Sequence, residues 1–80
     1  MKISVIKQLA ETHEVATLKK LEDDLVEGRS MEYEVGGEDE GEQLTHILGA
    51  IWVKEQMKIN GSDMRTEIRN FSGRVRGSIS

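Results

Sequence analysis

The feature that most constrains this chain is the stretch from Asp39 to Ile59, DEGEQLTHILGAIWVKEQMKI, whose apolar residues recur with helical spacing. On a wheel at about 100° per residue, six apolar side chains fall in one broad arc: Leu44, Ile47, Leu48, Ile51, Trp52 and Ile59. A narrower second stripe lies roughly opposite and comprises His46, Ala50, Val53 and Met57. The pattern predicts a central helix over about residues 39–59 that is apolar on two faces.

Local signals mark both ends of this helix. Asp39 and Glu42 have the spacing of a capping box, in which a side-chain oxygen accepts a hydrogen bond from the first free backbone N–H groups. Asn60 and Gly61 both tolerate a left-handed conformation, which stops a helix. We therefore expect this helix to have well-defined boundaries.

A helix with two apolar faces needs cover on both of them. The broad arc should face the core of its own chain, whereas the second stripe has two possible partners: other helices of the same chain, or a second copy. Eighty residues with 36% hydrophobic side chains form a small core, and such chains often gain stability by oligomerising. Both partners stay open, and our working hypothesis is a homodimer through the second stripe.

The first forty residues predict two shorter helices and an extended segment. Apolar spacing indicates a helix from Ile3 to about Thr12, with a strand over residues 2–6 as the competing interpretation. A second helix should run over about residues 14–27, be capped by Thr12 or His13, and end at Gly28.

Residues 31–35 alternate between apolar and acidic side chains, as a half-buried strand does. A lone strand lacks hydrogen-bond partners. We therefore favour an extended segment with Tyr33 against the helices, followed by a turn at Gly36 and Gly37.

The last helix should begin near Ser62 and Asp63. Its apolar stripe comprises Met64, Ile68, Phe71, Val75 and Ile79. Taken together, the patterns predict a mostly α fold with a single domain over residues 1–80. This domain is a small bundle of three to four short helices, with one extended segment (31–35) before the central helix.

Composition limits the chemistry and the surroundings of the chain. There is no cysteine, which excludes disulfides and thiolate chemistry, and no apolar run approaches the roughly 18 residues of a membrane span. We expect a cytoplasmic protein that does not bind membranes. Residues 1–40 carry five basic and eleven acidic groups, a net of −6, and residues 41–80 carry six basic and four acidic, a net of +2.

The uneven charge suggests an interaction surface. The acidic residues Glu38, Asp39 and Glu40 could complement Arg65 and Arg69, within one chain or between chains. We expect the main activity to be protein–protein interaction, with a further, unidentified protein as a possible partner beside a second copy.

Two alternatives remain for the function. Glu42 and His46 are one helical turn apart and, with His13, are candidate metal ligands or an acid–base pair, although no substrate-holding motif accompanies them. Arg65, Arg69 and Arg76 could contact phosphates, but the net charge of −4 disfavours nucleic acid. No cofactor motif is present, so we expect no cofactor, and the chain is more consistent with a non-enzyme.

Three segments resemble a family of short uncharacterised bacterial proteins of about this length. These segments are GEDEGEQLTHILGAIWVKE, the opening MKISVIKQL and the closing RVRGSI. The resemblance implies a compact, mostly helical unit and brings no known activity, ligand or catalytic residue with it.

Overall fold

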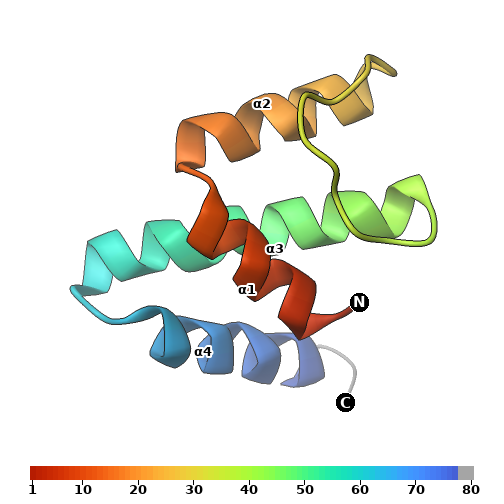
Figure 1. Cartoon of the computed structure of the whole chain (residues 1–80). Coiled ribbons are helices and arrows are strands. Elements are labelled where there is room, and N and C mark those ends of the chain that lie inside the picture. Colours follow the sequence, from red (N-terminus) through yellow and green to blue (C-terminus); the bar gives the residue numbers. More distant parts are fainter. Residues whose placement is uncertain (78–80) are drawn as a thin grey trace.

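The computed structural model describes residues 1–77, with side chains described through residue 75, and contains four α-helices in this part of the chain (Figure 1). They are α1 (Ile3–Thr12), α2 (Val15–Val26), α3 (Glu40–Asn60) and α4 (Met64–Gly77). Residues 1–77 contain no strand, so the predicted mostly α bundle is confirmed. The competing strand over residues 2–6 is wrong, because these residues begin α1.

The predicted ends of α3 and the predicted start of α4 are confirmed by their hydrogen bonds and dihedral angles. An Asp39 carboxylate oxygen accepts the Glu42 backbone N–H at 2.8 Å, so Asp39 is the N-cap. Gly61 ends α3 with a φ of 63°, in the left-handed region that favours glycine. Asp63 accepts the Thr66 backbone N–H at 2.8 Å and precedes α4 in the same way.

The predicted start of α2 at about residue 14 agrees with the structure to within one residue, but the predicted N-cap, Thr12 or His13, is wrong. Thr12 still belongs to α1, and His13 and Glu14 form a short extended connection. Glu14 occupies the N-cap position without a side-chain hydrogen bond to the helix. The end of α2 is as predicted, because Gly28 adopts a φ of 75° just after it.

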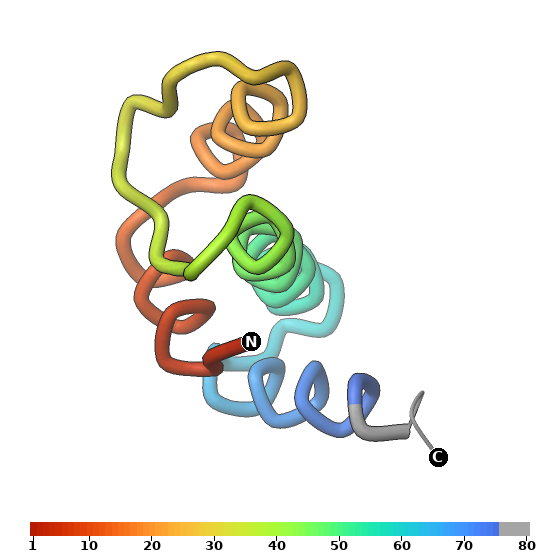
Figure 2. Tube along the Cα trace, turned by 90° about the vertical axis from the view of Figure 1, so that its right-hand side faces the viewer, coloured from red at the N-terminus to blue at the C-terminus, as the bar shows by residue number. Residues whose placement is uncertain are grey.

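Helix α3 lies at the centre of the fold. Figure 2 shows it nearly end-on, with α2 above it, α1 to its left and α4 below it. The buried apolar core lies between these helices and consists of Ile6, Leu9, Ala10, Leu18, Leu21, Val35, Ile47, Ala50, Ile51 and Val53. Residues 31–35 form neither helix nor strand and contain bends at Glu32 and Tyr33. Val35 reaches the core, and the Tyr33 ring packs at a tilt of 45° against the His13 ring, with centroids 4.7 Å apart.

Glycine at position 49 allows two helices to approach α3 closely. A Cβ at this position would lie 2.9 Å from Cδ1 of Ile6 in α1 and 3.0 Å from Cζ of Phe71 in α4. Both distances are shorter than ordinary van der Waals contact. Gly49 therefore marks the side of α3 on which α1 and α4 pack.

This packing corrects the assignment of the two apolar faces. In the second stripe, His46, Ala50 and Val53 are fully buried within the chain, and Met57 is half-buried. The prediction that this stripe forms a dimer interface is therefore wrong, because its own chain already covers it. The broad arc is divided instead: Ile47 and Ile51 are buried, but other members reach the surface.

Candidate functional site

An apolar strip remains open on α3, on the part of the broad arc that its own chain leaves uncovered. Leu48 is 45% exposed and Ile59 is 72% exposed, whereas Leu44 and Trp52 are half-buried. These four residues are called the open strip below. Their wheel positions lie on the side of α3 away from His46 and Ala50, and Trp52 is the member nearest to Gly49. In Figure 2 no helix covers the side of α3 opposite α1.

A charged residue interrupts the open strip, and aromatic contacts border it towards α4. On the wheel Glu55 falls among the apolar residues of the strip, its side chain is 47% exposed, and one of its carboxylate oxygens lies 3.5 Å from the Lys19 ammonium of α2. Towards α4, the Trp52 ring lies 5.7 Å from the Phe71 ring, centroid to centroid. The Arg74 guanidinium lies 5.6 Å from the centroid of a Trp52 ring, a cation–π contact. The contacts with Phe71 and Arg74 restrain the position of Trp52.

A groove of about 510 Å³ adjoins the strip between α3 and α4. Trp52, Arg69 and Arg74 line it, and both arginines are exposed. Its lining also includes side-chain amides, which donate hydrogen bonds, from Gln56, Asn60 and Asn70. The Asn60 and Asn70 amides already donate to a carboxylate of this chain, Glu67. The guanidinium groups of Arg69 and Arg74 are therefore the donors that suit a further carboxylate or another anion.

Glu67 also lines the groove, although it is only 2% exposed. One of its carboxylate oxygens accepts hydrogen bonds from Ser62 Oγ at 2.5 Å and Asn60 Nδ2 at 3.1 Å, and the other accepts from Asn70 Nδ2 at 3.2 Å. These donors, led by Ser62, lower the pKa of Glu67. Glu67 is therefore a charged carboxylate that holds the α3–α4 turn together.

His46 is fully buried and ties three segments together. Its Nδ1 lies 2.7 Å from the carbonyl oxygen of Gly36, which can only accept, so Nδ1 carries the proton. Its Nε2 accepts the Lys2 backbone N–H at 2.9 Å. Both ring nitrogens are therefore occupied by the backbone, and neither has a free lone pair for a metal or a substrate proton.

The other candidate metal ligands have separate neighbours. His13 stacks on Tyr33, and a carboxylate oxygen of Glu42 lies 4.0 Å from the amino group of Met1. In the part of the chain that the structure describes, no group of three potential metal-ligating side chains comes together. The arrangement thus gives the hypothesis of a Glu42–His46 metal site no geometric support.

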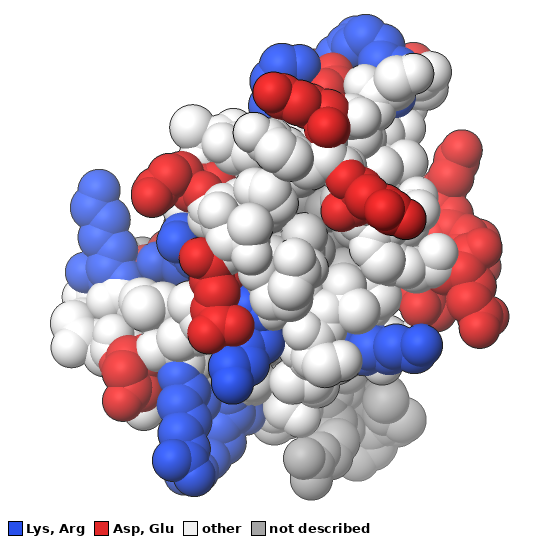
Figure 3. All heavy atoms as spheres, viewed as in Figure 1, with Lys and Arg blue, Asp and Glu red and all other residues white. Residues whose placement is uncertain are grey.

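The charged residues selected from the sequence lie on different parts of the surface. Glu38, Asp39 and Glu40 are exposed at the start of α3, and Arg65 and Arg69 are exposed on α4. Figure 3 shows acidic atoms gathered at its right-hand edge, where Figure 1 places the start of α3, and basic atoms at lower left over the start of α4. Among the described residues, no ion pair within 4.0 Å joins these two groups. The side chain of Arg76 and residue Ile79 lie outside the described part.

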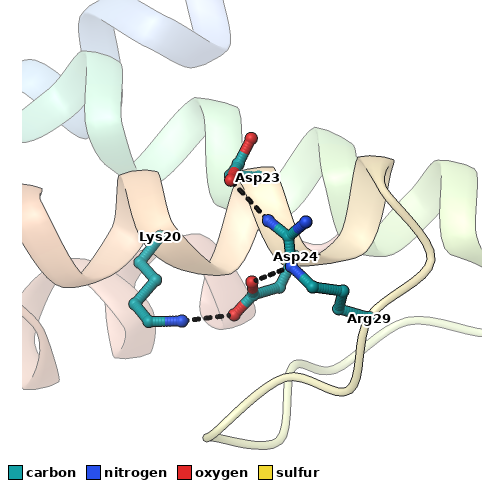
Figure 4. Close-up of polar contacts among 4 residues, drawn as sticks. All are labelled: Lys20, Asp23, Asp24 and Arg29. Atoms are coloured by element: carbon teal, nitrogen blue, oxygen red, sulfur yellow. Dashed lines mark hydrogen bonds and ion pairs between the residues drawn. The ribbon is translucent and has the colours of Figure 1, made fainter.

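A charge cluster at the end of α2 was not anticipated from the sequence. Asp24, only 4% exposed, accepts from Lys20 Nζ at 2.9 Å and from Arg29 Nε at 3.0 Å (Figure 4). Arg29 also lies 2.6 Å from an Asp23 oxygen. Lys20 and Arg29 lower the pKa of Asp24, so the cluster stays ionised and fixes the chain leaving α2. The four-residue spacing of Lys20 and Asp24 was the available signal.

No helix among residues 1–77 combines the length and the apolarity needed to cross a membrane. No curated protein and no solved structure matches this chain. A family model does match, over residues 1–80, and its description is a family of unknown function. The extent of this match agrees with the resemblance to a family of short uncharacterised proteins, and the chain belongs to this family of unknown function, DUF6952.

Proposed function

We propose that this chain is a cytoplasmic protein–protein interaction module that forms a homodimer through the open strip of α3. The observation that carries the proposal is the row of apolar side chains left at the surface of the longest helix, with Leu48 and Ile59 as its most exposed members. Exposed apolar side chains on one face commonly mark an association site. Lack of cysteine is compatible with a reducing compartment.

The dimensions of the face suit an interface of ordinary size. The 21 residues of α3 span about 30 Å, at about 1.5 Å per residue. A typical stable interface buries about 800 Å² on each partner, which is about 15% of the 5301 Å² accessible surface of this chain. A strip along α3 together with the adjoining flanks of α2 and α4 can supply that area.

A second copy is the occupant that the charges favour. The open strip has an exposed acidic group at one end, Glu38 to Glu40, and exposed arginines on α4 near the other. Two identical surfaces of this kind complement each other when they meet in opposite directions. An enzyme or metal-binding role has less support, because both nitrogens of His46 are occupied.

Light scattering tests the proposal through the mass in solution. At tens of micromolar the wild type should show twice 9.0 kDa, about 18 kDa, and should dissociate on dilution. Leu48→Glu should give a folded monomer, because it places a charge in the strip without touching the core. Val26→Glu is the matched control, because Val26 is 63% exposed on α2, outside the strip, and this variant should remain dimeric. A wild type that stays at 9.0 kDa at every concentration would refute the homodimer.

A further inference from the structure

We propose that the two copies pack α3 against α3 in antiparallel orientation, so that the acidic segment of each copy lies in the arginine groove of the other. The acidic segment is Glu38, Asp39 and Glu40, and the arginine groove is the one between α3 and α4 that contains Arg69 and Arg74. This inference rests on the proposed homodimer and adds its orientation and the residues that determine it.

The arginine groove has the chemistry of a carboxylate receptor. Arg69 is exposed and has no carboxylate within 4.0 Å among the described residues. Arg74 lies over the Trp52 ring, and this contact holds a guanidinium at the border between groove and open strip. A carboxylate in the groove would meet two cations, of which Arg74 is already restrained by its contact with Trp52.

The acidic segment is the complementary group on the same molecule. Glu38, Asp39 and Glu40 are all exposed. The Asp39 carboxylate is held by its N-cap hydrogen bond, so Glu38 and Glu40 are the two that can turn to a partner. Within one chain the segment and the groove lie towards opposite ends of α3, which explains why no ion pair joins them.

The direction of packing follows from this separation. Parallel packing of two α3 helices would bring acidic segment to acidic segment, whereas antiparallel packing brings each acidic segment to the groove end of the other copy. Because the dimer has twofold symmetry, the favourable contact between acidic segment and groove occurs twice. With the axis near residue 50, Leu48 faces Trp52 of the other copy, and Ile59 faces Gly41, an exposed position with no side chain to obstruct it.

Paired charge reversal tests the orientation. One variant reverses the groove with Arg69→Glu and Arg74→Glu, and the other reverses the segment with Glu38→Lys and Glu40→Lys, leaving Asp39 to cap α3. Each variant alone should self-associate roughly tenfold more weakly than the wild type or worse, because both contacts of its homodimer become repulsive. In a 1:1 mixture both contacts are attractive, so a heterodimer should form with about wild-type affinity.

The measurement is sedimentation equilibrium of each variant and of the mixture, with native mass spectrometry to distinguish the heterodimer by mass. Circular dichroism checks that both variants remain folded, and Arg69→Glu alone serves where loss of the Arg74–Trp52 contact destabilises α4. A heterodimer that forms in preference to either homodimer supports the antiparallel arrangement. Variants that dimerise like the wild type, or weakened variants that the mixture does not rescue, overturn it while leaving the homodimer intact. A monomeric wild type overturns both proposals.

Discussion

Removing the imidazole of His46 should destabilise the fold strongly, because this side chain is fully buried and both of its ring nitrogens are hydrogen-bonded to the backbone. In His46→Ala, the Gly36 carbonyl loses its donor and the Lys2 N–H loses its acceptor. Lys2 and Gly36 are both exposed residues, so both backbone groups can recover water. Each lost hydrogen bond then costs about 0.5–1.5 kcal/mol, or about 1–3 kcal/mol for the two together.

The cavity left by the ring adds to this cost. Truncation of a fully buried Phe side chain costs about 3–5 kcal/mol. An imidazole is smaller, so we assign about 2 kcal/mol to the cavity that its removal leaves. The sum is about 3–5 kcal/mol. A domain of this size has a free energy of unfolding of about 4–12 kcal/mol, at about 0.05–0.15 kcal/mol per residue. His46→Ala should therefore remove a quarter or more of the stability.

Urea unfolding followed by circular dichroism and by the fluorescence of Trp52, the only tryptophan, measures this loss. His13→Ala is the control: His13 is half-buried and its stacking contact with Tyr33 is worth about 1 kcal/mol. Nitrogen chemical shifts of His46 should independently report a proton on Nδ1 and none on Nε2. A loss below about 1 kcal/mol in His46→Ala, or a proton on Nε2, would refute the structural role.

Two further predictions concern helix packing and pH. Gly49→Ala should be neutral to destabilising by about 2 kcal/mol, because overpacking against Ile6 and Phe71 opposes the gain of about 1 kcal/mol in helix propensity. Gly73→Ala has open space around its Cβ and should stabilise the fold by about 0.5–1 kcal/mol. Urea unfolding midpoints compare the two variants, and equal stabilisation would contradict the close packing at Gly49. The folded-state pKa of Glu67 lies below its ordinary 4.5, so its contribution to stability is complete above about pH 4.5 and is lost as the pH falls through the folded-state value. Glu67→Gln should therefore unfold with a weaker dependence on pH between pH 5 and pH 3 than the wild type, and parallel curves would contradict an ionised Glu67.

Helix boundaries could be predicted because the signals that set them are local. Asp39 and Asp63 each cap a helix by accepting the backbone N–H three residues further along the chain. Gly61 ends α3 because glycine can adopt a positive φ. The start of α2 lacked such a signal, because Glu14 caps it without a side-chain hydrogen bond. The sequence therefore placed this boundary to within one residue but gave the wrong capping residue, because no side-chain hydrogen bond defines the cap.

The buried face of α3 could not be predicted from the wheel alone. Both arcs are apolar, and the choice between them depends on where α1 and α4 pack, which is a long-range property. Gly49 and Ala50 were the available signal, because small side chains on one side let neighbouring helices approach closely. The larger residues Leu48 and Ile59 contribute more to a hydrophobicity pattern, yet they remain at the surface.

The interaction residues chosen on α3 from the sequence lie mainly on the face that the chain itself buries. His46 was selected for its chemistry, but its partners are backbone groups of Lys2 and Gly36, which no sequence pattern identifies. Glu67 was overlooked because a single glutamate on a polar helix looks solvated, whereas three neutral donors brought together by the α3–α4 turn surround it.

The central claim, that two copies meet on the open strip of α3, is tested most directly by site-specific cross-linking. The chain contains no cysteine, so Leu48→Cys and Val26→Cys each introduce a single thiol at an exposed aliphatic position. With a short bis-maleimide cross-linker at low micromolar protein concentration, Leu48→Cys should form a covalently linked species of about 18 kDa, twice 9.0 kDa, much faster than Val26→Cys. Equal rates, or faster cross-linking at position 26, would contradict the proposed interface.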